Sequence, residues 1–139
     1  MRDLPAWLGQ YVGLPYRAGG ETRAGVDCWG LLALVWREQF ARELPPYRGP
    51  LWQIGADANS IADAAQAHAS AFVGINPEAE QIGDGLLLRI GAGPLHIGMV
   101  VGSRCMLHAQ ESTLSCVERY DSVHWRRRWL GFYRPGAET

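Results

Sequence analysis

The chain has 139 residues, of which 47% are hydrophobic and 19% are charged, and its net charge is −1. This length and composition fit a single domain, residues 1–139, with a substantial core, and they exclude global disorder. The near-zero charge gives no reason to expect a nucleic-acid partner. Three cysteines at irregular spacing do not form a disulfide framework, and no apolar run approaches the roughly 20 residues that span a bilayer.

Helical patterns dominate the first half of the chain. Residues 5–12 have a short amphipathic pattern, and a glycine-rich loop follows. The run from Trp29 to Phe40 is apolar around most of a helical circumference, which predicts a buried helix with Asp27 as its N-cap. Alanine-rich periodicity from Asn59 to Phe72 predicts a second helix, within an insert at about 57–72. The N-terminus lacks the apolar segment of a signal peptide.

The second half of the chain has the pattern of an antiparallel sheet. Short segments rich in β-formers alternate with turn signals. They lie at 85–90, 95–102, 104–110, 114–120 and 130–135. Helices followed by strands are typical of an α+β fold, with N-terminal helices packed on a C-terminal antiparallel β-sheet.

Cys28 follows the predicted N-cap directly, in the stretch GVDCWGLL. A thiol there is open to four interpretations: a core cysteine, half of a disulfide, a metal ligand or a nucleophile. The first turn of a helix has unpaired N–H groups and the positive end of the helix dipole, which favour a thiolate. A nucleophile also needs a base nearby and a group that orients the base.

Two histidines on neighbouring predicted strands are the candidates for that base and its partner. His96 shares a strand face with Gly98 and Val100, an open, glycine-lined side that another group can approach closely, and His108 is on the next strand. Leu95, Ile97, Met99 and Val101 share the other face of the strand, which we expect to be the core face. A plain two-residue turn at Gly102–Ser103 would put the two imidazoles on opposite faces. A Cys–His–His site therefore requires a three-residue loop or a β-bulge in this hairpin.

Two other interpretations of the same region are weaker. Cys105, His108 and Cys116 lie within twelve residues, but they lack the paired spacing of structural zinc, and alternation puts Cys105 and His108 on opposite faces. We therefore expect no metal and no cofactor. The cluster HWRRRW mixes basic and aromatic residues, and we interpret it as a solvated edge or a partner surface rather than a nucleic-acid site.

The order of these motifs resembles the NlpC family of cell-wall cysteine peptidases. The matching residues are LPYRAGG and GVDCWGLL, then IGDGLLLRI, LHIGMVVG and MLHA. The resemblance implies a circularly permuted papain-like fold, with Cys28 as nucleophile, His96 as general base and His108 as the residue that orients it. It also implies that Tyr16, with the backbone of Cys28, helps to hold the oxyanion or substrate, and that Asp27 has a structural role.

Two departures from the family pattern concern Trp29, which stands where serine is usual, and Gly85 in the IGDGLLLRI strand. The tail HWRRRWLGFYRP resembles the branch found in the tails of phages and gene transfer agents. The resemblance thus implies a peptidoglycan endopeptidase that cleaves stem-peptide amide bonds, γ-D-glutamyl-diamino acid in particular. Its partners would be tail or baseplate proteins, and a tail particle would deliver it from the cytoplasm to the cell wall.

Two alternatives to a peptidase stay open on the sequence alone. One is a non-catalytic hub or plug module of a tail with a vestigial site. The other is a lipid-directed thiol acyltransferase with the same permuted fold.

Overall fold

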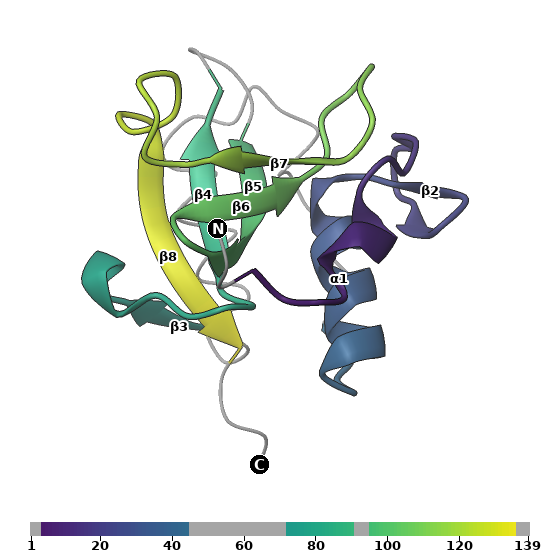
Figure 1. Cartoon of the computed structure of the whole chain (residues 1–139), viewed down its shortest axis with the longest axis horizontal. Helices are drawn as coiled ribbons and strands as arrows, with labels where there is room; N and C mark the ends of the chain where they lie inside the picture. Colours follow the sequence, from purple (N-terminus) through teal and green to yellow (C-terminus); the bar gives the residue numbers. More distant parts are fainter. Residues whose placement is uncertain (1–3, 45–71, 91–94, 136–139) are drawn as a thin grey trace.

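A computed structural model describes residues 4–44, 72–90 and 95–135. In this part of the chain one α-helix, α1 (Cys28–Gln39), lies against a six-stranded antiparallel sheet, as Figure 1 shows. The strand order is β3-β8-β4-β5-β6-β7. The helix-and-antiparallel-sheet architecture agrees with the predicted α+β class, while the permuted papain-like connectivity stays a prediction. None of the described helices has the length and apolarity needed to cross a membrane.

The six strands of the main sheet are β3 (Phe72–Ile75), β4 (Gly85–Arg89), β5 (Leu95–Gly102), β6 (Cys105–His108), β7 (Cys116–Arg119) and β8 (Trp129–Pro135). A separate two-stranded ribbon precedes α1 and consists of β1 (Glu21–Thr22) and β2 (Gly25–Val26). Two short 3-10 turns, η1 (Leu8–Tyr11) and η2 (Pro77–Ala79), complete the described elements.

All five predicted strands are present, but the N-terminal segment differs from its predicted helix. The segment 5–12 contains only the single 3-10 turn η1. The predicted insert at 57–72 lies outside the described residues except for its last residue, Phe72, which begins strand β3. β3 pairs with the far end of β8, from Phe72 opposite Pro135 to Ile75 opposite Phe132. This strand was missed because its apolar residues continued the helical pattern.

Helix α1 is buried along most of its length, as its sequence predicts. Its residues from Cys28 to Val35 are buried against the sheet and against the N-terminal segment that carries Leu8 and Tyr11. At the other end of the helix the Trp36 indole N–H donates to the carbonyl of Gly83, 2.8 Å away, which ties the helix to the start of β4. The helix axis is therefore fixed at both ends.

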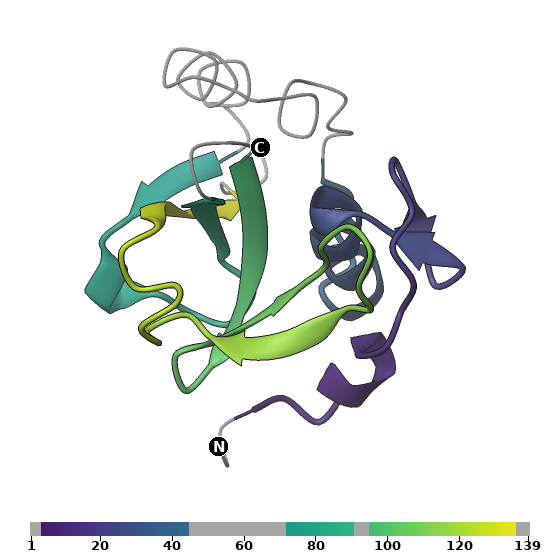
Figure 2. The same cartoon turned by 90° about the horizontal axis from the view of Figure 1, so that it is seen from above.

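The sheet is buried on both faces, and this differs from the expectation for β5. Ile97, Met99 and Val101 pack with α1, as predicted. The opposite face, which we expected to be open around Gly98, packs into a second core with Trp125 and Phe132. Figure 2 shows that the sheet is strongly curled. His96 is consequently only 3% exposed.

An ion pair between a buried carboxylate and a partly exposed guanidinium joins the turn before β4 to the end of β8. The Arg134 guanidinium donates to both carboxylate oxygens of Asp84, at 2.7 and 2.9 Å, and Asp84 is 1% exposed. The second oxygen of Asp84 also accepts the N–H of Gln81 at 2.7 Å. The aspartate of the IGDG motif therefore has a structural role, which is to hold the two strands beside the site in register.

Candidate active site

Asp27 forms the predicted N-cap and also fixes the preceding loop. One carboxylate oxygen accepts the N–H of Gly30 at 2.6 Å, and the other accepts the N–H of Gly19 at 2.8 Å. Asp27 is 2% exposed, so burial raises its pKa while these two N–H groups oppose the rise. The structural role that the sequence suggested for Asp27 is confirmed by these contacts.

Gly30 allows the loop to approach the first turn of α1 closely. A Cβ at this position would lie 1.7 Å from the Gly20 carbonyl oxygen. That carbonyl accepts the backbone N–H of Asp27 at 3.2 Å. A glycine two residues after the cysteine is thus required by the packing of the loop over the helix start.

The Cys28 side chain lies at the start of α1, against strand β5. Backbone N–H groups of Ile97, Trp29 and Cys28 itself lie near the sulfur and lower the pKa of the thiol. Ile97 directly follows His96, so the sulfur lies beside the strand that carries the predicted base. No hydrogen bond joins the Cys28 sulfur to His96 within the described residues.

Burial dominates the ionisation of Cys28. The residue is 8% exposed, and burial raises the pKa of the thiol to about 11, despite the N–H groups that lower it. The sequence-based expectation that the helix start favours a thiolate is therefore wrong for the resting site. Removal from water destabilises the thiolate more than the helix N-terminus stabilises it.

The hairpin between β5 and β6 contains the bulge that a His–His pair requires. Met99 faces Leu107 and Val100 faces Met106, but Gly102 faces Cys105, so one residue, Val101, is extra on β5. The turn itself consists of Ser103 and Arg104, both with positive φ. The bulge shifts the register by one residue and brings the two histidines to the same face.

The two imidazoles are hydrogen-bonded to each other and then to a carboxylate. His96 Nε2 lies 2.8 Å from His108 Nδ1, and His108 Nε2 lies 2.6 Å from an oxygen of Glu118 on β7. The juxtaposition of His96 and His108 that the bulge predicted is thus present. Glu118 extends the row to three groups, and its side chain is 42% exposed while His108 is 1% exposed.

Trp125 covers both histidines on the side of the second core. Its ring is stacked on His96, with centroids 6.0 Å apart and an interplanar angle of 23°, and meets His108 edge-on at 5.5 Å. Burial lowers the pKa of His96 to about 3, with a smaller contribution from His108. Burial also lowers the pKa of His108, which Glu118 opposes. Both imidazoles are therefore uncharged at neutral pH.

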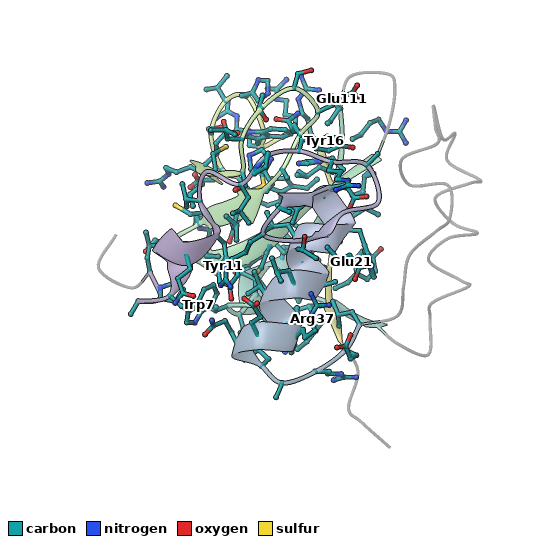
Figure 3. The ribbon with its side chains drawn as sticks, turned by 90° about the vertical axis from the view of Figure 1, so that its right-hand side faces the viewer. Trp7, Tyr11, Tyr16, Glu21, Arg37 and Glu111 are labelled. Atoms are coloured by element: carbon teal, nitrogen blue, oxygen red, sulfur yellow. The ribbon has the colours of Figure 1, made fainter. Side chains whose placement is uncertain are left out.

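Tyr16 lies near the thiol, on the loop that precedes the ribbon. It forms a backbone bridge with Val26, two residues before Cys28. The Tyr16 ring is half-buried, and its pKa is raised by burial and then by the charges of Cys28, Asp27 and Glu111. Figure 3 shows Tyr16 and the exposed Glu111 at the same end of α1. The structure thus places Tyr16 beside the predicted nucleophile.

Trp29 is a core residue. It is 5% exposed and belongs to the cluster of side chains between α1 and the sheet. Its burial explains how the family's usual serine can be replaced here, because the ring fills the core and does not line an open surface.

The thiol-rich segment divides between the two faces of the sheet, as alternation predicts. Cys105 packs with α1, whereas the Cys116 sulfur lies 3.7 Å from His108 Nε2. His108, Cys116 and Glu118 can each offer one ligand atom, and these atoms all lie within 4.8 Å of one another. The structure therefore joins two of the three residues of the weak metal pattern, but replaces Cys105 by Glu118.

Sequence reasoning missed Glu118 and Trp125 as residues of the site. For Glu118 one signal was available. The two-residue alternation along β7 puts Cys116 and Glu118 on one face, and the pairing of β6 with β7 puts that face beside His108. Trp125 had no local signal. It reaches the histidines from the loop between β7 and β8 only because the sheet is curled. The HWRRRW cluster is thus partly buried, with Arg126 and Arg127 exposed.

Curated relatives and solved structures agree on the kind of domain. The chain is 26% identical over 119 residues to the murein DD-endopeptidase/murein LD-carboxypeptidase MepS of Escherichia coli (strain K12), covering 86% of this chain and 54% of MepS. It is 27% identical over 124 residues to the probable endopeptidase NlpC of the same strain, covering 88% of this chain and 70% of that protein. It therefore spans about half of the length of the first of these relatives.

Solved structures share the fold at low sequence identity. The NlpC/p60 domain of the peptidoglycan hydrolase SagA superposes with a TM-score of 0.59 at 19% identity and covers 92% of each chain. An NlpC/P60 family protein from Bacillus cereus gives a TM-score of 0.65 at 20% identity, covering 95% of this chain and 41% of that one. The NlpC/P60 family model matches residues 13–134. With the sequence, the fold and the site in agreement, the chain belongs to the NlpC/P60 family.

Proposed function

We propose that this chain is a cysteine endopeptidase that hydrolyses amide bonds in peptidoglycan. One observation carries the proposal: a thiol at the start of a buried helix lies against the strand whose His96 is hydrogen-bonded to His108. The curated relatives support the substrate, because MepS is named a murein endopeptidase and LytE of Bacillus subtilis (strain 168) a probable peptidoglycan endopeptidase.

The hydrogen bonds from His96 through His108 to Glu118 determine which nitrogen of His96 can act as the base. Nε2 of His96 is engaged by His108, so Nδ1 is the nitrogen left to accept the Cys28 proton. Nδ1 can accept only if Nε2 carries the ring proton and donates it to Nδ1 of His108. His108 must then carry its own proton on Nε2, where Glu118 accepts it. Glu118 thereby fixes the tautomer of both imidazoles and acts as a positioning residue.

The resting groups are uncharged, so proton transfer accompanies attack on the carbonyl. Cys28 gives its proton to His96 as the sulfur bonds to the carbonyl carbon, and His96 returns the proton to the leaving amine. Water then hydrolyses the thioester and restores the thiol. The N–H groups of Cys28 and Trp29 at the helix start, with the Tyr16 hydroxyl, are the donors for the oxyanion; one such donor contributes about 2.7–4 kcal/mol in other enzymes.

The bond cleaved is a finer proposal. The motif resemblance favours the γ-D-glutamyl-diamino acid bond of the stem peptide, whereas the name of MepS points to DD-endopeptidase and LD-carboxypeptidase specificity. These outcomes give products of different mass from the same purified sacculi. Mass spectrometry of the released muropeptides therefore separates them.

Digestion of purified sacculi by wild type, Cys28→Ser and Cys105→Ala tests the activity. We expect wild type to release muropeptides and Cys28→Ser to release almost none. Cys105→Ala should also release them, because Cys105 lies on the opposite face of β6 from His108. Circular dichroism checks that each variant is folded. Equal digestion by Cys28→Ser would refute the mechanism, and no digestion by folded wild type would favour the vestigial tail module or the acyltransferase.

We further propose that the chain acts as part of a phage-like tail or baseplate that delivers it to the cell wall. The support is the resemblance of the segment HWRRRWLGFYRP to the tail-associated branch. In the structure this segment offers exposed Arg126 and Arg127 beside Val123, which is 80% exposed. Fractionation of particle preparations tests the idea. The chain should sediment with tails, and recovery only as free protein would contradict it.

A further inference from the structure

We propose that His108, Cys116 and Glu118 form a binding site for a thiophilic divalent cation of the zinc type, and that the bound cation switches the catalytic histidine to an inactive tautomer. The first half concerns the three side chains alone. The second half rests on the proposed function, because it assumes that His96 is the base.

The donor set suits such a cation. One sulfur, one imidazole nitrogen and one carboxylate oxygen are the ligands that Zn²⁺ takes, whereas Ca²⁺ and Mg²⁺ prefer oxygen alone. His108 Nε2 and the Cys116 sulfur are 3.7 Å apart. Two such ligands, at the usual bond lengths of about 2.0 and 2.3 Å, lie roughly 3.5 Å apart around a tetrahedral ion.

The third ligand requires a small movement at the surface. Glu118 lies 2.6 Å from His108 Nε2, in a hydrogen bond that the cation would replace. The Glu118 side chain is 42% exposed and Cys116 is partly exposed, so the carboxylate has room to move and the ion has a path from solvent. Three protein ligands leave the fourth position for water, as in open zinc sites.

The neighbouring histidine supplies the support that metal-binding imidazoles need. A histidine that ligates a metal usually donates its other ring N–H to a nearby acceptor. His108 Nδ1 already lies 2.8 Å from His96 Nε2. The buried Trp125 ring packs against both histidines and holds His108 in this orientation.

Binding of the cation would exchange donor and acceptor in the hydrogen bond between His108 and His96. The cation takes the Nε2 lone pair of His108, whose ring proton then resides on Nδ1 and is donated to His96 Nε2. The proton of His96 moves to its Nδ1, so this nitrogen can no longer accept the proton of Cys28. Cys116 loses its proton to solvent, and neither imidazole changes its charge. The cation would therefore inhibit the peptidase without touching Cys28.

Cobalt titration tests the site separately from the activity. Co²⁺ added to folded Cys28→Ser protein should produce a sulfur-to-cobalt charge-transfer band, which must disappear in Cys28→Ser/Cys116→Ala. The Zn²⁺ affinity of each protein is measured by competition with a chromogenic chelator. It should fall in the double variant by at least roughly 10–100-fold, which is the loss seen elsewhere when an outer-shell partner is removed. A band that survives removal of Cys116, or no band at all, would overturn the site.

Inhibition tests the switch. The digestion rate of each protein is normalised to its own rate without metal. The Zn²⁺ concentration that halves this rate should be higher for Cys116→Ala than for wild type, in proportion to the variant's loss of Zn²⁺ affinity. Wild type and Cys116→Ala that are equally inhibited would refute the switch, because the cation would then act at Cys28. A folded wild type with no peptidase activity, but with the cobalt band, would refute the proposed function and leave the cation site standing.

Discussion

The ionisation of Cys28 makes a prediction about stability at high pH. Burial raises the pKa of this thiol from an ordinary 9.0 to about 11 in the folded chain. A group whose pKa is raised by folding contributes stability that is fully present below its unfolded pKa and is lost as pH rises toward the folded value. At about 1.4 kcal/mol per pKa unit, the loss is on the order of 3 kcal/mol in all, of which about 2 kcal/mol is reached by pH 11.

Comparison with Cys28→Ser isolates this contribution, because serine does not titrate in the same range. The free energy of unfolding is measured in urea for both proteins at about pH 8 and about pH 11. The other alkaline groups titrate in both proteins and cancel in the difference. We expect wild type to lose about 2 kcal/mol relative to the serine variant between these two pH values. No relative loss by wild type, or a relative gain, would refute the raised pKa of the Cys28 thiol.

Three further predictions concern the structural support of the site. Glu118→Leu should lower kcat about tenfold with little change in KM, since a lost hydrogen bond to His108 is worth about 1–1.5 kcal/mol. Glu118→Gln keeps a carbonyl acceptor and should therefore retain most of the rate. Gly30→Ala should lower the free energy of unfolding by about 1–3 kcal/mol, with Gly9→Ala as a control whose added methyl meets nothing within 4 Å. Asp84→Asn should cost about 1–3 kcal/mol in the same urea assay, because it weakens the charge-assisted hydrogen bonds from the partly exposed Arg134 guanidinium.

Much of the site could be predicted because its signals are local. The start of α1 follows from Asp27 as its N-cap. The need for a bulge in the β5–β6 hairpin follows from counting residues between His96 and His108. Each of these inferences uses only chain spacing and the two-residue period of a strand.

The rest depends on the curvature of the sheet, which the sequence pattern does not encode locally. Alternation identified Ile97, Met99 and Val101 as one buried face of β5 and left the histidine face open. In the structure the sheet curls until β8 and the preceding loop cover that face, so Trp125 reaches His96. The same burial determines the direction of the thiol and imidazole pKa values. A prediction from the helix dipole alone therefore had the wrong sign.

The orientation of the hydrogen-bonded row has a consequence for how the site can be regulated. In a Cys–His–His site that ended at the second imidazole, either tautomer of that ring would be available, and nothing at the surface would choose between them. Here Glu118 accepts from His108 at 2.6 Å, so a half-exposed carboxylate selects the tautomer of a ring that is 1% exposed. Any ligand that takes Glu118 or the lone pair of His108 Nε2 reverses that choice. In the proposed mechanism, the tautomer of His96 would therefore be controlled from the edge strand β7.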